Sequence, residues 1–156
     1  MSLKNKLQSQ LNRAAGGPQN VQLVEGALQL TCTLSEVHPL ACRFDRLAVA
    51  TDALRDASAE QLKGLSEALA ERINYLLEPI SPIEFDRQGC TVQLRSNPPQ
   101  MGDDRTTYYE LVVRRGGELA LCRYQKPRGQ VRQAIPAVVT QEVLLRLVSD
   151  FEAVLE

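Results

Sequence analysis

Residues 108–124 of the chain read YYELVVRRGGELALCRY. Two runs rich in β-branched and aromatic residues flank Gly116 and Gly117, and a Gly-Gly pair can adopt the positive φ angles that a two-residue hairpin turn requires. The stretch therefore predicts a β-hairpin with Arg115 opposite Glu118 at the turn. A register fixed in this way determines which side chains share a face of the sheet.

The two faces of this hairpin are expected to differ in character. The face turned to the core should carry apolar and aromatic pairs, namely Val113 with Ala120, Leu111 with Cys122, and Tyr109 with Tyr124. On the opposite face Glu110 is expected to meet Arg123, and an opposite-charge pair of this kind contributes roughly 0.2–1 kcal/mol across two strands. The hairpin thus predicts an antiparallel sheet with one apolar face.

Strand patterns occur on both sides of this hairpin. Residues 27–35 alternate strictly between apolar and polar side chains, which is typical of a half-buried strand. A second strand is expected over residues 42–49, with a change of face near Asp45. Residues 83–95 predict another hairpin, and residues 131–134 predict an edge strand.

Three segments have helical patterns. The first runs from Ser2 to Ala15 and ends at a Gly-Gly-Pro stop signal. Ser58 and Gln61 form a capping box, and the helix that they open is expected to run to Leu77. Thr140 is expected to cap the last helix, whose apolar side chains form one broad face.

This order of elements predicts an α+β fold. The sheet should be antiparallel with about five to seven strands, two amphipathic helices should pack on one of its faces, and a short N-terminal helix should lie at an edge. Residues 1–17 are expected to form this peripheral helix, and residues 18–156 a single α+β domain.

Composition limits the classes of partner. The chain has 156 residues with a formal net charge of −1 and is 44% hydrophobic, so it is long enough to bury its own core. This charge balance argues against a general affinity for nucleic acid, which needs an excess of basic charge. No apolar run approaches the length of a membrane span, and the four cysteines form no CxxC pair, so a cytoplasmic protein with reduced thiols is expected.

The first helix contains one candidate binding surface. Leu3, Leu7 and Leu11 recur every four residues and form a narrow apolar stripe, while the rest of the helix is polar. The stripe can pack on the edge of the domain. Alternatively, it can bind a partner or a second copy of the chain.

A second candidate surface is basic. Arg114, Arg128, Arg132 and Lys126 lie on neighbouring predicted strands and turns, and arginine is suited to phosphate and carboxylate groups. They predict an anion site, for which the long loop predicted over Ser96–Thr107, without secondary structure of its own, could act as a lid. Disorder or plain connection, partner contact, and metal binding or hydrolytic catalysis through its two aspartates, Asp103 and Asp104, remain alternatives for that segment.

No catalytic residue or metal ligand is predicted. The only histidine, His38, precedes a proline in an expected surface turn, and no nucleophile lies in a recognisable context. Cys32, His38 and Cys42 have spacings that match no common zinc site. No cofactor is expected, and a non-enzymatic function is favoured, although enzymatic activity stays open.

The predicted order of helices and strands resembles that of small bacterial secretion chaperones and their relatives. The likeness covers no motif, and this chain has more strands after the middle helix. The resemblance implies a dimer that holds an unfolded segment of a partner. We therefore expect a self-associating protein-interaction module of unknown partner, and as the alternative a small-molecule or anion-binding domain using Arg114–Arg132.

Overall fold

The computed structural model describes residues 1–13 and 16–155. Their helices and strands follow in the order α1 (Leu3–Asn12), β1 (Gln19–Glu25), β2 (Leu28–Val37), β3 (Cys42–Thr51), a 3-10 turn (Asp52–Leu54), α2 (Ala59–Arg72), β4 (Ile80–Asp86), β5 (Thr91–Ser96), β6 (Gln100–Met101), β7 (Arg105–Arg114), β8 (Glu118–Pro127), β9 (Gln133–Ile135), β10 (Ala137–Val139) and α3 (Gln141–Leu155). The expected end of the first helix at residues 14–15 lies outside the described residues.

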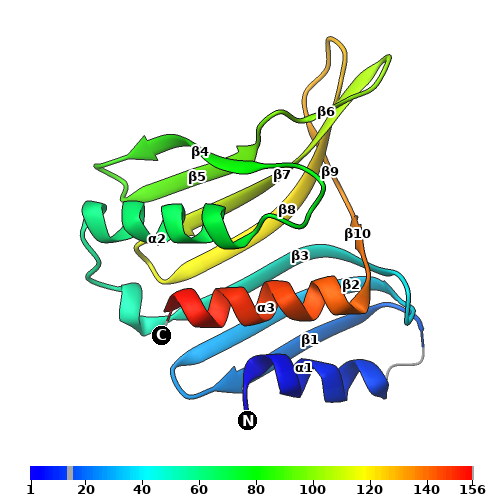
Figure 1. Cartoon of the computed structure of the whole chain (residues 1–156), viewed down its shortest axis with the longest axis vertical. Coiled ribbons are helices and arrows are strands. Elements are labelled where there is room, and N and C mark those ends of the chain that lie inside the picture. The colour runs from blue at the N-terminus through cyan, green and yellow to red at the C-terminus, as the bar shows by residue number, and fades with distance from the viewer. Residues whose placement is uncertain (14–15, 156) are drawn as a thin grey trace.

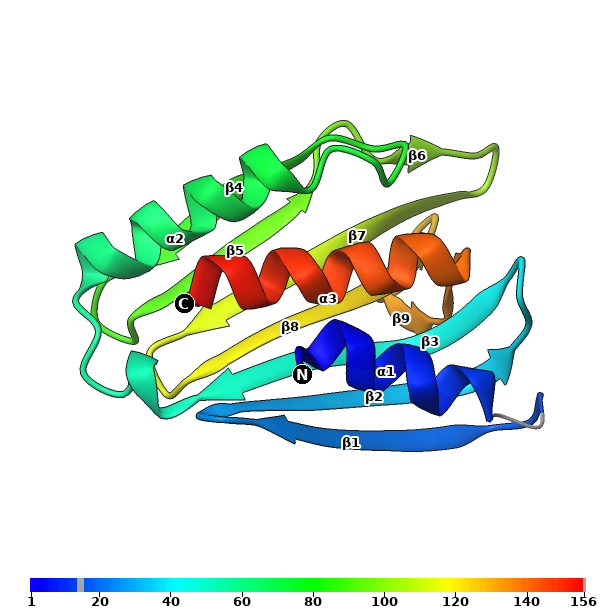
Figure 2. The same cartoon turned by 60° about the horizontal axis from the view of Figure 1, so that its bottom comes forward.

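The strands form one antiparallel sheet, and the helices cover one face of it (Figures 1 and 2). The main path is β1-β2-β3-β8-β7-β5-β4, and the short strands β6, β9 and β10 pair with β7, β8 and β3. The α+β fold with an antiparallel sheet is confirmed. The sheet is larger than expected, because the short strands bring the number to ten around a core of seven.

The strand patterns of the first half are confirmed. In β2, Leu30, Cys32 and Leu34 are buried as the alternation predicts. The change of face in β3 is a β-bulge at Asp45, since Phe44 pairs with Leu34 while Arg46 pairs with Thr33. An extra residue in one strand leaves both flanking apolar runs directed toward the helices.

The helix caps are confirmed, but α2 is shorter than predicted. Ser58 and Gln61 make the reciprocal capping box, and Thr140 accepts a hydrogen bond from the Val143 amide. The helix ends at Arg72 instead of Leu77. Pro79 accounts for part of the difference, because a proline ring clashes with the carbonyl four residues earlier and restricts the residue before it.

The segment expected to be a structureless loop between residues 96 and 107 is largely a β-hairpin. β5 extends to Ser96, and β6 pairs with β7 through Gln100–Thr107 and Met101–Thr106. Only the turn around Asp103 connects β6 and β7. A short ladder therefore accounts for the length of this segment.

The register of the β7–β8 hairpin differs by one residue from the prediction. Its loop has three residues, so Arg114 pairs with Glu118, Leu111 with Leu121, and Tyr109 with Arg123. Gly117 has φ 104, and its carbonyl accepts a hydrogen bond from the Thr51 amide at 2.7 Å. A three-residue hairpin loop commonly ends with a left-handed residue, and the contact with β3 selects this geometry.

The shift in register turns β8 over. Leu119 and Leu121 face the core instead of Ala120 and Cys122. The predicted pairs Glu110–Arg123 and Arg115–Glu118 do not form. Glu110 pairs with Cys122, which is the neighbour of Arg123 in β8, so the side chains of Glu110 and Arg123 lie on opposite faces of the sheet.

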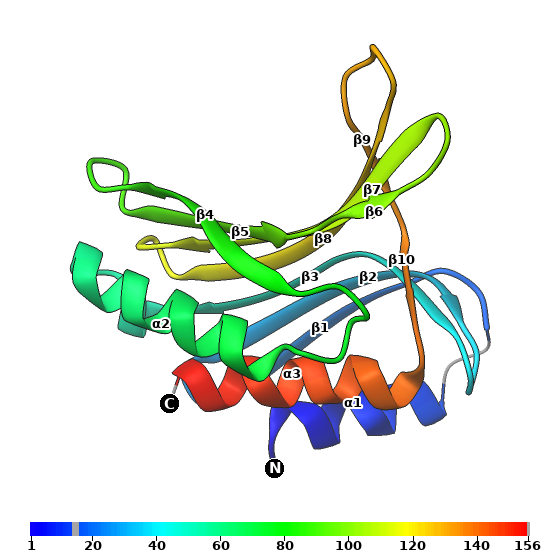
Figure 3. The ribbon, with the colours of Figure 1, turned by 45° about the horizontal axis from the view of Figure 1, so that its top comes forward.

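The sheet divides where β3 and β8 stop pairing with each other. The two strands pair only through residues 47–50 and 118–121. Beyond this point β9 adds to β8 and β10 adds to β3, with Pro136 between them. This β9–β10 segment, residues 133–139, crosses from β8 to the start of α3 (Figure 3).

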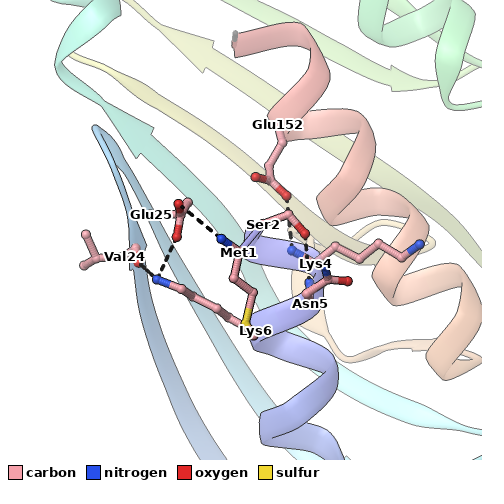
Figure 4. Close-up of polar contacts among 8 residues, drawn as sticks. All are labelled: Met1, Ser2, Lys4, Asn5, Lys6, Val24, Glu25 and Glu152. Atoms are coloured by element: carbon pink, nitrogen blue, oxygen red, sulfur yellow. Dashed lines mark hydrogen bonds and ion pairs between the residues drawn. The ribbon is translucent and has the colours of Figure 1, made fainter.

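The N-terminus of α1 is fixed by side chains from two other elements (Figure 4). The Lys4 amide donates to the Glu152 carboxylate of α3 at 3.1 Å, and the Asn5 amide donates to Ser2. Lys6 forms an ion pair with Glu25 of β1 at 2.8 Å. A carboxylate at this end is favoured because helix amides and the helix dipole are both electropositive there.

Glu152→Ala should lower the free energy of unfolding by up to about 2 kcal/mol, because it removes a largely buried anion from a helix N-terminus. Urea denaturation measures this change. Glu25→Ala is the matched control: it removes an acid that is paired at the surface, so its denaturation midpoint should stay close to that of the parent. Equal destabilisation by both changes would contradict the anchoring role of Glu152.

The buried thiol of Cys32 should make the folded protein less stable at high pH. Burial raises its pKa from 9.0 to about 12. Above pH 9 the unfolded chain therefore loses a proton that the folded chain retains, and the free energy of unfolding should fall as pH rises toward 12. One such group contributes up to about 1.4 kcal/mol per pH unit.

Urea titrations at several pH values in this window measure that slope. In the Cys32→Ala variant the free energy of unfolding should fall less steeply with pH, because one titrating group has been removed. This difference in slope is expected whatever the variant does to stability at neutral pH. Equal slopes in parent and variant would show that the thiol does not contribute.

Candidate functional site

A groove lies between the loop after α2, the β9–β10 segment and the start of α3. Its volume is about 570 Å³. The walls are mostly apolar and come from all three segments: Leu76, Leu77, Ile135, Pro136, Val138 and Val143. Leu77 is 93% exposed and Val138 is 50% exposed. The groove therefore presents apolar surface that residues 1–13 and 16–155 leave uncovered.

The floor of the groove carries an ion pair. Arg123 Nη2 lies 3.0 Å from Glu78 Oε2, and the side chains are only 12% and 4% exposed. Arg123 also donates to Thr107 at 3.2 Å, and its guanidinium carbon lies 4.4 Å from the centroid of the Tyr109 ring. These contacts fix the plane of the guanidinium group.

This ion pair is incompletely satisfied. Glu78 Oε1 and Arg123 Nη1 are shielded from solvent and have no hydrogen-bond partner among the described residues. Polar atoms in such surroundings are normally paired, because leaving a buried donor or acceptor unmade costs about 1–3 kcal/mol. Glu78 Oε1 thus lacks a donor, and Arg123 Nη1 lacks an acceptor, among the described residues.

The loop over the groove is tied to α3 by an aromatic side chain. The Tyr75 hydroxyl donates to Asp150 at 2.6 Å, and the Arg146 guanidinium lies 4.0 Å from the centre of the Tyr75 ring. Burial, followed by the hydrogen bond to Asp150, raises the pKa of the Tyr75 phenol. The phenol therefore remains a hydrogen-bond donor throughout the neutral pH range.

The next part of this loop is strained. Leu77 has φ 66, in the left-handed region that residues other than glycine rarely occupy. Its side chain points away from the core although Leu76 beside it is buried. Among the described residues, the exposed Leu77 side chain makes little packing that could offset the cost of this backbone conformation.

The four predicted anion-binding residues do not converge. Arg114 and Arg132 line one hollow of about 370 Å³ on the face of the sheet opposite the helices, together with three acids, Glu84, Asp86 and Glu110. Lys126 lies near the end of β8, and Arg128 follows it in the turn; both side chains are exposed.

The arginines in that hollow already have acidic neighbours. Arg132 and Arg95 both pair with the buried carboxylate of Glu110, and Arg132 stacks on the Tyr124 ring. Arg114 lies 3.7 Å from Glu118. An anion at this place would meet three carboxylates, and the anion site stays a prediction.

The leucine stripe of the first helix is buried in the core of the fold. Leu3 and Leu7 are fully buried, Leu11 is 3% exposed, and α1 packs against α3 and β1. A partner would reach these side chains only if α1 left the sheet. Their role in partner binding stays a prediction.

Cys42 lies beside the backbone of the only histidine, since its Sγ atom donates to the His38 carbonyl at 3.6 Å, but the imidazole itself points elsewhere. His38 is an exposed turn residue beside Glu36, with its Nε2 atom 3.0 Å from the carboxylate. Cys32, Cys42 and Cys90 are buried, whereas Cys122 lies half-buried on the face opposite the helices. Within residues 1–13 and 16–155, no three His, Cys, Asp or Glu side chains gather in a way that could hold a metal ion.

Sequence reasoning did not find the groove. The pattern around Leu76 and Glu78 predicted the end of a helix, and Arg123 was assigned to a surface pair with Glu110. One signal was present: in the observed register Arg123 shares a strand face with Leu119 and Leu121. An arginine in phase with core leucines indicates a buried acid nearby.

In the part of the chain that the structure describes, no helix has both the length and the apolar character needed to cross a bilayer. Neither a scan of family models nor searches of curated proteins and solved structures found a match to this chain.

Proposed function

We propose that this chain is a non-enzymatic protein-interaction module that holds a segment of a partner protein in the groove beside α3. The observation that carries this proposal is the uncovered apolar wall formed by Leu77 and Val138 over a buried polar floor. Binding sites commonly combine apolar walls with a few placed polar groups. The resemblance in the order of elements to secretion chaperones points in the same direction.

The size of the groove fits a short segment. A volume of about 570 Å³ is within the range of ligand pockets, and it is too small for a folded domain. An extended segment that inserts two or three side chains matches these dimensions. Apolar burial then provides the affinity, and the floor provides the specificity.

Photo-crosslinking in the protein's native host tests this function. A benzophenone amino acid at position 138 lies on the groove wall, and the same residue at position 131 is the matched control, because Val131 is 82% exposed and lies away from the groove. We expect a discrete adduct with one or a few proteins at position 138. No adduct above the level obtained at position 131 would overturn the proposal.

We further propose that the chain self-associates through β1. This strand is one end of the sheet, and its outer edge has no strand neighbour in residues 1–13 and 16–155. Unpaired edges bind a second strand readily, although Lys6 occupies the Val24 carbonyl. Native mass spectrometry should show an even-numbered oligomer, and an exclusively monomeric protein would refute this part.

A further inference from the structure

We infer that β1 pairs with β1 of a second copy of the chain in one register, centred on Gln22, and that Lys6 blocks this edge in the unpaired chain. The inference rests on the proposed self-association and specifies its geometry and its regulation. It is carried by the contrast between the two ends of the sheet, by the hydrogen bond from Lys6 to β1, and by the sequence of β1 itself.

The two ends of the sheet, β4 and β1, differ in how their outer edges are protected (Figure 2). β4 contains Pro82, which has no N–H to donate, and its pairing with β5 is irregular between Pro82 and Glu84. Both features hinder the addition of a further strand. β1 contains no proline, and its register with β2 runs without a shift from Gln19 to Glu25. β1 is therefore the end that can accept another strand along its whole length.

Two contacts show which backbone groups of β1 face outward. Lys6 Nζ donates to the Val24 carbonyl at 2.5 Å, so this carbonyl is accessible at the outer edge. Glu25 closes the two-residue turn opposite Leu28, which directs the N–H and C=O of Glu25 toward β2. These directions alternate along a strand. The residues whose N–H and C=O face outward are therefore Asn20, Gln22 and Val24.

One antiparallel register uses all three outward residues of both copies. It places Gln22 opposite Gln22 of the second copy and Asn20 opposite Val24, and each such pair exchanges two hydrogen bonds, which gives a ladder of about six. Sliding one strand by two residues places Val24 opposite Pro18, which has no N–H, or Asn20 opposite Gly26 in the turn. Both shifted registers lose hydrogen bonds, so the central register is favoured.

The side chains of β1 suit the same register. On the face toward the helices, Val21 of one copy lies opposite Leu23 of the other, and this apolar pair extends the core across the new boundary. On the opposite face the two Gln22 side chains are neighbours. Glu25 lies opposite Gln19, so no like charges meet. β1 is thus complementary to itself, which favours a second copy over an unrelated strand.

Lys6 blocks the edge that this pairing needs. Its ammonium group occupies the Val24 carbonyl and also pairs with Glu25 at 2.8 Å (Figure 4). In the paired state the Val24 carbonyl accepts the Asn20 amide of the second copy instead, while Lys6 can keep its ion pair with Glu25. An edge lysine is a common protection against strand pairing. Each copy therefore gives up one hydrogen bond from Lys6 when the two strands pair.

Sedimentation equilibrium of two lysine variants tests this block. Lys6→Ala should lower the dissociation constant of the dimer at least about tenfold, because neither copy then loses a hydrogen bond from a charged donor. Lys4→Ala is the matched control: it removes the same charge from the same helix, and Figure 4 shows the Lys4 ammonium group directed away from β1. An unchanged constant for Lys6→Ala, or equal tightening in both variants, would overturn the role of Lys6.

NMR tests the register on an equal mixture of isotope-labelled and unlabelled protein. The Hα atoms of a non-hydrogen-bonded antiparallel pair lie close together, so an intermolecular NOE should join Val21 Hα to Leu23 Hα. An NOE from Val21 to Val21, or from Leu23 to Leu23, would instead indicate a shifted register and overturn the one inferred. Gln22→Pro should abolish the dimer and leave the fold intact, because the N–H that it removes faces outward.

The outcomes separate the inference from the proposed function. A parent and a Lys6→Ala variant that both stay monomeric at about 1 mM would remove the self-association and the inference together. A dimer that persists in folded Gln22→Pro protein, or that lacks the Val21–Leu23 contact, would overturn the pairing and leave self-association standing. A monomeric parent that forms the contact only after Lys6→Ala would support the pairing and the block. The crosslink at position 138 reports on the groove alone.

Discussion

Glu78→Ala should lower the free energy of unfolding by about 3–5 kcal/mol, because it leaves the guanidinium of Arg123 buried without its counter-charge. The remaining contacts of Arg123, with Thr107 and the Tyr109 ring, hold the side chain in place and prevent it from turning to solvent. Urea denaturation followed by circular dichroism measures the loss. A loss below about 1 kcal/mol would show that the pair behaves as a solvated surface pair.

The matched control replaces both partners. The variant with leucine at both Glu78 and Arg123 removes the buried charges together, and its stability should stay much closer to that of the parent. The two single leucine variants complete a double-mutant cycle. A positive coupling energy in this cycle would assign the loss to the unpaired charge rather than to lost packing.

Gly117→Ala should destabilise the protein by roughly 3 kcal/mol or more. The left-handed conformation itself costs an alanine about 1–2 kcal/mol. In addition, a Cβ atom at this position would meet the Thr51 carbonyl oxygen and displace β3 from the turn. The hydrogen bond from the Thr51 amide to the Gly117 carbonyl would then weaken.

Gly116→Ala is the matched control for this turn. A Cβ atom at Gly116 meets no atom within 4 Å, and its φ is not in the left-handed region. The free energy of unfolding of the Gly116→Ala variant should therefore differ from that of the parent by no more than about 0.5 kcal/mol. Similar losses in both variants would favour the two-residue turn that the sequence suggests, in which both glycines need positive φ.

Features that depend on a few neighbouring residues could be predicted from the sequence. The alternation of β2 and the bulge at Asp45 follow from apolar periodicity alone. The capping box of Ser58 joins groups only three residues apart. The predictions of these elements are correct because the residues that determine each element lie within it.

The position of the groove could not be predicted in this way. Its floor joins Glu78 to Arg123, which are 45 residues apart, and its wall adds Val138 from the segment that crosses the split in the sheet. No local pattern specifies that these residues meet. Their encounter depends on the pairing of β9 with β8 and of β10 with β3.

The sequence by itself determined the fold class, the faces of β2 and β3, and the start of the helices at Ser58 and Thr140, because periodicity and capping are local interactions. Tertiary structure decided which face of β8 is buried, because β8 pairs with β3 in the observed register and the Thr51 amide donates to the Gly117 carbonyl at the turn. It also decided where α2 ends, since Tyr75 binds Asp150 of α3 and Leu76 enters the core. Contacts between distant residues outweigh local propensity at these two places, and the candidate groove depends on both.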